Sequence, residues 1–276
     1  MSGSSTTLLA DVTLPYHVRV GAGAPPLVFV HGFGCSHEDW HAQLVHFGPT
    51  RSSVACDLRG HGATPGRPAE CSIETYGADV AELLRALELP RAVLVGHSMG
   101  CRVVLQAALD APGRVAGLVL IDGSRVGEGE AAAAARAAGD AVAARGYTAF
   151  AEKLFEDMFL PSSDAALRER IVARGRALPE AIGAALFPRM AAWDAVNMER
   201  ALSAIRQPIL VIQSTSMNAT RIRVPLEPGD TTPLLDLVRS CAPQARIEIV
   251  SGVGHFAQLE AAERVNTLIG DFVATL

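Results

Sequence analysis

Short apolar segments recur along the chain, and most of them run into a glycine or a polar residue. They contain β-branched and aliphatic residues without polar alternation, which is typical of strands buried on both faces of a parallel sheet. We therefore predict strands at Leu27–Val30, Ser53–Cys56, Ala92–Val95, Val115–Ile121, Ile209–Ile212 and Ile247–Val250. The less regular segment Leu14–Val20 is expected to form an antiparallel strand at the edge of the sheet.

Helical patterns lie between several of these segments. Apolar residues recur near helical spacing in Ile73–Leu89, where Pro90 follows as a stop signal. Cys101–Leu109 and Ala261–Leu276 are also expected to be helices. Alternation of strands and helices predicts an α/β fold with a mostly parallel central sheet flanked by helices.

One long stretch, residues 125–204, breaks this alternation. It contains no convincing strand and is rich in alanine, which has the highest helix propensity. We interpret it as a helical lid inserted between two strands of the sheet. The predicted organisation is therefore a core domain made of residues 1–124 and 205–276, with a lid or cap of residues 125–204.

Composition narrows the class of protein. The chain has 276 residues, of which 49% are hydrophobic and 19% charged, so it is expected to be globular. A net charge of −5 argues against a nucleic-acid-binding face, which would be basic. Five scattered cysteines, without paired motif spacing, suggest reduced thiols. With no signal-peptide pattern and no membrane-spanning run, we expect a cytoplasmic protein.

The segment Gly96-His97-Ser98-Met99-Gly100 matches the pattern G-x-S-x-G. It stands directly between a predicted strand and a predicted helix, which is the context in which this pattern forms a nucleophile elbow. Such a turn lifts the serine hydroxyl out of the sheet and places it at the positive end of the following helix. Ser98 is therefore the candidate nucleophile.

The chain resembles the α/β-hydrolase superfamily from about Leu14 to its C-terminus, and in particular its small cofactor-free esterases and lactonases. Four motifs in the family's order carry the resemblance: His31-Gly32-Phe33-Gly34, Asp57-Leu58-Arg59-Gly60-His61-Gly62, the Ser98 elbow, and Gly252-Val253-Gly254-His255-Phe256. The resemblance implies the α/β-hydrolase fold, with Asp57 shaping a loop near the pocket and His31 and His61 bracing loops.

A serine hydroxyl needs a neighbouring base, and His255 is the candidate. It follows the last predicted strand, so its loop should meet Ser98 at the carboxyl ends of the strands. The resemblance assigns the oxyanion hole to the main-chain N–H groups of Phe33 and Met99. His97 is expected to pack sideways next to the nucleophile.

The acid that orients the base has three candidates. In most of the family it follows the strand that here is Ile209–Ile212, but the next six residues contain no carboxylate. We favour Asp122, because it ends the strand Val115–Ile121 and would be held rigidly. Asp230, in a displaced version of the usual loop, is the second candidate, and Asp194 is the third.

No cofactor and no metal are implied. Gly21-x-Gly23 precedes a strand and is not followed by a helix, so it is interpreted as a turn. His37 and His41 have a spacing that could hold a metal on a helix, but no third ligand is evident.

We expect a serine hydrolase that cleaves carboxylic esters, including lactones or thioesters, through an acyl-enzyme on Ser98. Trp40 and Phe256 are expected to line the substrate pocket, together with lid residues Phe155, Met158 and Phe159. The alternatives are a carbon–carbon bond hydrolase or synthase that uses the same residues, and a binding or signalling protein with slow turnover. We expect the partner to be a small-molecule substrate of the ester type.

Overall fold

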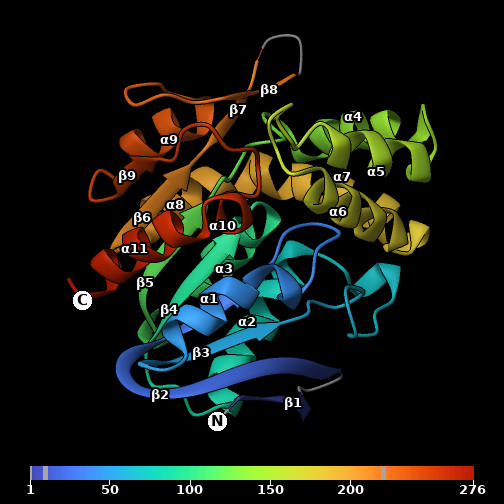
Figure 1. The fold of residues 1–276 in the computed structure, drawn as a ribbon. Coiled ribbons are helices and arrows are strands. Elements are labelled where there is room, and N and C mark those ends of the chain that lie inside the picture. Colours follow the sequence, from blue (N-terminus) through green and yellow to red (C-terminus); the bar gives the residue numbers. More distant parts are fainter. Residues whose placement is uncertain (1, 9–11, 219–221) are drawn as a thin grey trace.

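A seven-stranded sheet forms the centre of the computed structural model, which describes residues 2–8, 12–218 and 222–276 (Figure 1). Its strands are β1 (Ser2–Leu8), β2 (Thr13–Val30), β3 (Arg51–Cys56), β4 (Ala92–His97), β5 (Val115–Ile121), β6 (Ile209–Gln213) and β9 (Arg246–Ile249). The order is β1-β2-β4-β5-β6-β9, with β3 also paired to β2. β1 pairs antiparallel to β2, and the other neighbours pair parallel. The predicted α/β fold is confirmed.

The long strand β2 contains both Leu27–Val30 and all of Leu14–Val20, the predicted edge strand. It bends so that Tyr16 and Val30 both lie opposite Cys56 of β3. At the bend, a Cβ on Gly21 would lie 2.2 Å from the Arg51 nitrogen, so a larger residue cannot be accommodated without a shift. The outer edge is formed by β1, which the apolar pattern did not reveal.

Helices cover both faces of the sheet. The helices of the core are α1 (His41–Phe47), α2 (Ile73–Ala86), α3 (Met99–Asp110), α9 (Pro233–Cys241), α10 (Ala257–Glu260) and α11 (Ala262–Val273), with 3₁₀ turns at His37–Trp40, Pro68–Glu70 and Pro112–Arg114. Ser72 caps α2 by accepting a hydrogen bond from the Thr75 N–H. The helix ends before the predicted Leu89, because Glu88 has a left-handed backbone (φ 52°).

The core is divided by the sheet into two apolar clusters. One contains Trp40, side chains of α1 and α11, and alternate residues of the strands, such as Phe29. The other contains side chains of α2, α3 and α9 on the opposite face, together with Leu94 of β4. Both faces of the parallel strands are therefore buried, as their continuous apolar runs indicate.

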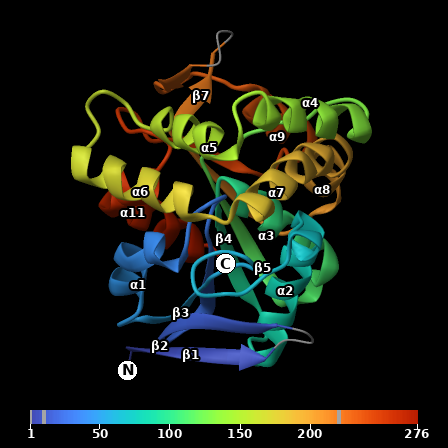
Figure 2. The same ribbon diagram turned by 90° about the vertical axis from the view of Figure 1, so that its right-hand side faces the viewer.

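A helical segment, residues 125–204, connects β5 to β6. It contains α4 (Ala131–Ala143), α5 (Tyr147–Glu156), α6 (Ala165–Ala177), α7 (Glu180–Trp193), a π-helical turn (Asp194–Met198) and α8 (Glu199–Ala204). Figures 1 and 2 place α4–α7 beyond one end of the central strands. That this segment acts as a lid domain stays a prediction.

A small hairpin lies at the same end of the sheet, above β6 (Figure 1). Its antiparallel strands are β7 (Thr215–Met217) and β8 (Arg223–Pro225). In the described residues, none of the helices is long and apolar enough to span a bilayer.

Leu94→Ala tests the packing of the central strands. Leu94 is fully buried, so its truncation is expected to lower the free energy of unfolding by about 2–5 kcal/mol in urea titrations. The matched control is Leu276→Ala, because Leu276 is 40% exposed, and its loss should cost about 0.5 kcal/mol or less. Equal losses for the two variants would contradict this description of the core.

Candidate active site

Ser98 stands at the tight turn between β4 and α3. Its backbone is left-handed (φ 53°, ψ −112°), a strained conformation for a residue with a side chain. A Cβ on Gly96 would lie 2.3 Å from the Gly100 oxygen, and one on Gly100 would lie 2.3 Å from the Val30 oxygen. The two glycines are therefore required by the close approach of strand, helix and neighbouring strand. The predicted strand–turn–helix geometry is present.

His255 lies in the loop between β9 and α10, and it is fixed by contacts on several sides. Its N–H donates to the Met158 carbonyl (2.8 Å), and its own carbonyl accepts from His97 Nε2 (2.9 Å). The Ser214 hydroxyl donates to the neighbouring Gly254 carbonyl (2.8 Å). His97 thus packs beside the nucleophile, as expected, and also holds the backbone of His255.

Asp122 directly follows β5 and contacts the His255 ring. Its Oδ2 lies 2.5 Å from His255 Nδ1. A left-handed backbone at Asp122 (φ 44°) and its N–H bond to the Ile212 carbonyl (2.8 Å) fix this turn against the end of β6. The N–H groups of Ser214 and Thr215 donate to Oδ1 at 2.7 and 2.9 Å. The segment after β6 therefore supplies amides to a carboxylate that comes from β5.

Burial and neighbouring charges determine the protonation states of Asp122 and His255. Burial by itself would raise the pKa of Asp122, but hydrogen bonding to His255 and the nearby Arg223 charge lower it to about 2. Burial and the Arg223 charge lower the pKa of His255 to about 4, against the opposing effect of Asp122. At neutral pH the pair is an aspartate and a neutral imidazole.

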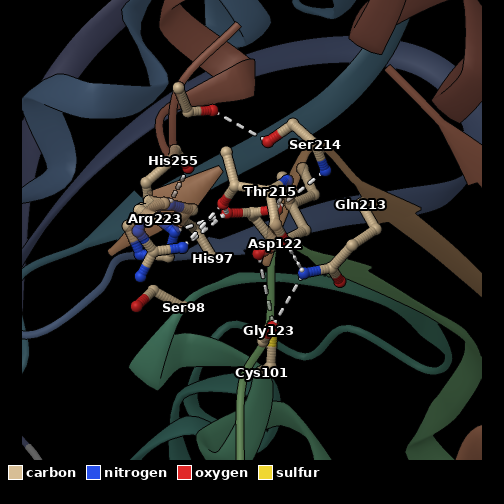
Figure 3. A network of polar contacts seen from close by, with 12 residues as sticks. His97, Ser98, Cys101, Asp122, Gly123, Gln213, Ser214, Thr215, Arg223 and His255 are labelled. Atoms are coloured by element: carbon tan, nitrogen blue, oxygen red, sulfur yellow. Dashed lines mark hydrogen bonds and ion pairs between the residues drawn. The ribbon is translucent and has the colours of Figure 1, made fainter. Parts of the chain in front are cut away.

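The other ring nitrogen, His255 Nε2, is buried and has no hydrogen-bond partner in the described residues. Figure 3 shows Ser98 and His255 on the same side of Asp122. Among the described contacts, the Ser98 hydroxyl makes no hydrogen bond to Nε2. Nucleophile–base bonds are often long or poorly aligned without substrate and tighten when it binds. Within the described residues, no other hydrogen bond prevents Nε2 from accepting the proton of a nucleophile.

The two other acid candidates lie elsewhere. Asp230 is exposed and accepts a hydrogen bond from the Glu227 N–H (2.8 Å). Asp194 is fully buried and forms a two-pronged ion pair with Arg102, at 2.7 Å for each contact. Neither carboxylate contacts His255 in this structure.

The predicted oxyanion-hole donors are main-chain N–H groups. Met99 is the first residue of α3, so its N–H has no acceptor within the helix. Neither this group nor the Phe33 N–H donates a hydrogen bond within the described part of the chain. The Phe33 ring lies 5.8 Å from the ring of Phe187 and 6.5 Å from that of Phe155, both in the helical segment. An apolar wall therefore adjoins this loop.

Two of the side chains predicted to line the substrate pocket are fully buried, and their role in the pocket stays a prediction. Trp40 has no exposed surface and packs against Phe29 (ring centroids 5.1 Å apart) on the α1 face of the sheet. Phe256 is also fully buried, between His97 and Phe159, and its ring stacks on Phe159 at 5.3 Å. Both side chains pack in the core here, because large aromatic rings next to the strand ends gain more from burial than from exposure.

Loop bracing explains the remaining polar motif residues. His31 Nε2 accepts from the Leu58 N–H (3.0 Å), and His61 Nδ1 contacts the Arg59 carbonyl (3.1 Å). Asp57 accepts from the N–H and Nδ1 of His37, at 2.7 and 2.9 Å. These contacts tie two loops beside the elbow together. His37 is therefore paired with a carboxylate, and the described residues hold no cluster of three metal-ligating side chains.

Arg223, on β8, is the site residue that the sequence analysis missed. Its Nη1 lies 2.6 Å from Thr215 Oγ1 and 3.3 Å from Asp122 Oδ2 (Figure 3). The sequence analysis gave no role to Arg223. The sequence nevertheless contained a hint of this role. Arg223 follows the strand Ile209–Ile212, at whose end the usual catalytic carboxylate is missing.

Known proteins resemble this chain over most of its length. The model of the alpha/beta hydrolase family matches residues 27–268. The dihydrolipoyllysine-residue acetyltransferase component of an acetoin cleaving system from Cupriavidus necator is 29% identical over 92% of this chain. An sn-1-specific diacylglycerol lipase from Danio rerio is 37% identical over 44% of it. The chain spans 64% and 39% of the lengths of these two relatives.

Solved structures agree in fold. An N-acyl homoserine lactone degrading enzyme, Est816, superposes with a TM-score of 0.79 and 26% identity, covering 97% of this chain and all of the other. A thermophilic esterase from Thermogutta terrifontis gives a TM-score of 0.79 at 24% identity, covering 100% and 98% of the two chains. With the family model matching most of its residues, the chain belongs to the α/β-hydrolase family.

Proposed function

We propose that this protein is a serine hydrolase that cleaves carboxylic esters, including lactones, through an acyl-enzyme on Ser98. The observation that carries the proposal is the 2.5 Å contact between Asp122 and His255. It leaves Nε2 buried and without a partner among the described residues, with His255 on the same side of Asp122 as Ser98 (Figure 3). The strained turn at Ser98 and the main-chain donors at Phe33 and Met99 complete the set of groups that acyl transfer needs.

In this mechanism, Ser98 Oγ attacks the acyl carbon while His255 Nε2 takes the hydroxyl proton. Asp122 keeps the proton of Nδ1 in place and stabilises the imidazolium that forms. The Phe33 and Met99 N–H groups bind the oxyanion. His255 then gives its proton to the leaving alcohol oxygen, and water resolves the acyl-enzyme by the same steps in reverse.

The comparisons support an ester or lactone substrate without fixing which one. Among the similar structures is an N-acyl homoserine lactone degrading enzyme, at 26% identity. The diacylglycerol lipase matches less than half of this chain. Because one fold hosts many reactions, the substrate has to be argued from the site itself.

Ser98→Ala tests the nucleophile. A fluorophosphonate probe should add once, to Ser98 of the wild type, and intact-mass spectrometry should find no adduct on the variant. Hydrolysis of p-nitrophenyl butyrate should fall by about 10⁶-fold, the loss known for such a serine in subtilisin. A wild type with neither adduct nor turnover would contradict the proposal and favour a binding protein.

Asp122→Asn tests the acid. The amide cannot hold His255 in the required tautomer, so kcat should fall by about 10⁴-fold, the loss that the corresponding substitution causes in a serine protease. Asp230→Asn is the matched control, because Asp230 is exposed and contacts only its own loop. Near-full activity of Asp122→Asn, or a comparable loss in the control, would exclude Asp122 as the acid.

The pH dependence of kcat/KM tests the base. His255 must be neutral to accept a proton, and its lowered pKa keeps it neutral to pH values below the ordinary 6.5. The groups that face it are Asp122, Arg223, Arg102 and His97, of which the arginines favour the neutral ring. Activity should therefore stay high as pH falls through 6.5 and drop only nearer pH 4. An acid limb at or above 6.5 would contradict this environment.

A further inference from the structure

Arg223 is buried next to the candidate triad, with only 9% of its side chain exposed. Burying a guanidinium is unfavourable unless its charge and its five donors are matched by partners. One nitrogen, Nη1, contacts Thr215 Oγ1 and Asp122 Oδ2. In the described part of the chain, the Nε and Nη2 groups make no hydrogen bond. The side chain therefore has donors that the fold does not use.

Two other buried arginines show what such donors do in this protein. Arg59 presents Nε and Nη2 to Asp79 at 2.6 and 2.7 Å. Arg102 presents the same edge to Asp194, with both contacts at 2.7 Å. In each case the planar fork binds both oxygens of one carboxylate. In Arg223 the same Nε–Nη2 edge contacts no carboxylate of the described chain.

Asp122 does not account for this arginine. It already accepts hydrogen bonds from the N–H groups of Ser214 and Thr215, from Thr215 Oγ1 and from His255 Nδ1. The Arg223 contact, at 3.3 Å, is the longest of the five. Arg223 contacts Asp122 through Nη1 alone. The Nε–Nη2 edge, which matches the shape of a carboxylate, therefore remains for another group.

A second acidic group whose charge acts on Arg223 also has a partner of its own. Asp157, at the end of α5, contributes a favourable charge at Arg223, but both of its oxygens contact Lys153. In Figure 3 the guanidinium lies on the same side of Asp122 as Ser98 and His255. The guanidinium is therefore on the side of Asp122 where Ser98 would attack the acyl group of a substrate.

We propose that Arg223 binds a free carboxylate of the substrate, so that the preferred substrates are esters or lactones that carry a second, ionised carboxyl group. This inference rests on the proposed ester hydrolysis. The Nε–Nη2 edge holds the two carboxylate oxygens, as Arg59 and Arg102 hold aspartates, while Nη1 keeps its contact with Asp122. Arginine suits this role because its fork matches a planar carboxylate and keeps its charge at all working pH values.

The test compares pairs of methyl esters that differ only in charge. Methyl hydrogen glutarate is paired with methyl 5-methylhexanoate, in which an isopropyl group replaces the carboxylate, and shorter and longer pairs vary the spacing. Methanol release is followed by NMR. The wild type should prefer the charged member of at least one pair by about tenfold or more in kcat/KM.

Arg223→Gln should bring that ratio to about one, whatever happens to the separate rates. A purely structural role would lower both rates together and leave the ratio unchanged. Arg223→Lys keeps the charge but not the fork and should retain part of the preference. Arg206→Gln, which removes an exposed arginine, is the charge-matched control and should preserve the wild-type ratio.

Binding of glutarate, measured by calorimetry, separates this inference from the proposed function. The wild type and Arg206→Gln should bind it, and Arg223→Gln should bind at least tenfold more weakly. If the wild type hydrolyses no ester but binds glutarate through Arg223, the reaction is wrong and the carboxylate site stands. If neutral esters are hydrolysed without a charge preference, or glutarate binds equally to all variants, the carboxylate site is wrong and the hydrolase stands.

Discussion

The carboxylate of Asp122 is the point on which the candidate site depends. It is fully buried, and its donors come from the segment after β6, from the hairpin strand β8 and from the loop after β9. A buried charge with too few partners would destabilise the fold, so the convergence of these segments on Asp122 stabilises the folded state. The same convergence orients His255. Stability and the geometry of the base thus follow from one set of hydrogen bonds.

The strand order explains why the acid can come from β5. In the sheet, β5 lies between β4, which ends at the elbow, and β6, which precedes the segment that lacks a carboxylate. Because the left-handed turn at Asp122 directs the side chain toward that segment, the amides of Ser214 and Thr215 become its donors. The chain thus places a carboxylate where β6 ends, although β6 itself does not provide it.

Much of the fold could be predicted because its causes are local. Continuous apolar runs mark strands buried on both faces, and the pattern around Ser98 requires glycines wherever strand and helix come into contact. The hairpin β7–β8 could not be predicted, since each strand has only three residues and no apolar alternation. Arg223 was missed for a related reason. It lies on this hairpin, and its role depends on which carboxylate lies next to it in space.

The orientation of two aromatic side chains near the site also could not be predicted from the sequence. Trp40 and Phe256 follow motifs that lie beside the site in sequence, but their rings are fully buried. Proximity along the chain fixes where a backbone passes and not the direction in which a side chain points. The acid candidates were separable only once the sheet order brought one of them next to His255.

The bond from the His255 N–H to the Met158 carbonyl joins the loop of the base to the helical segment through main-chain atoms alone. A contact of this kind does not depend on which side chain stands at position 158. The side chain at position 158 can therefore be replaced without removing the hydrogen bond that joins the helical segment to the histidine loop.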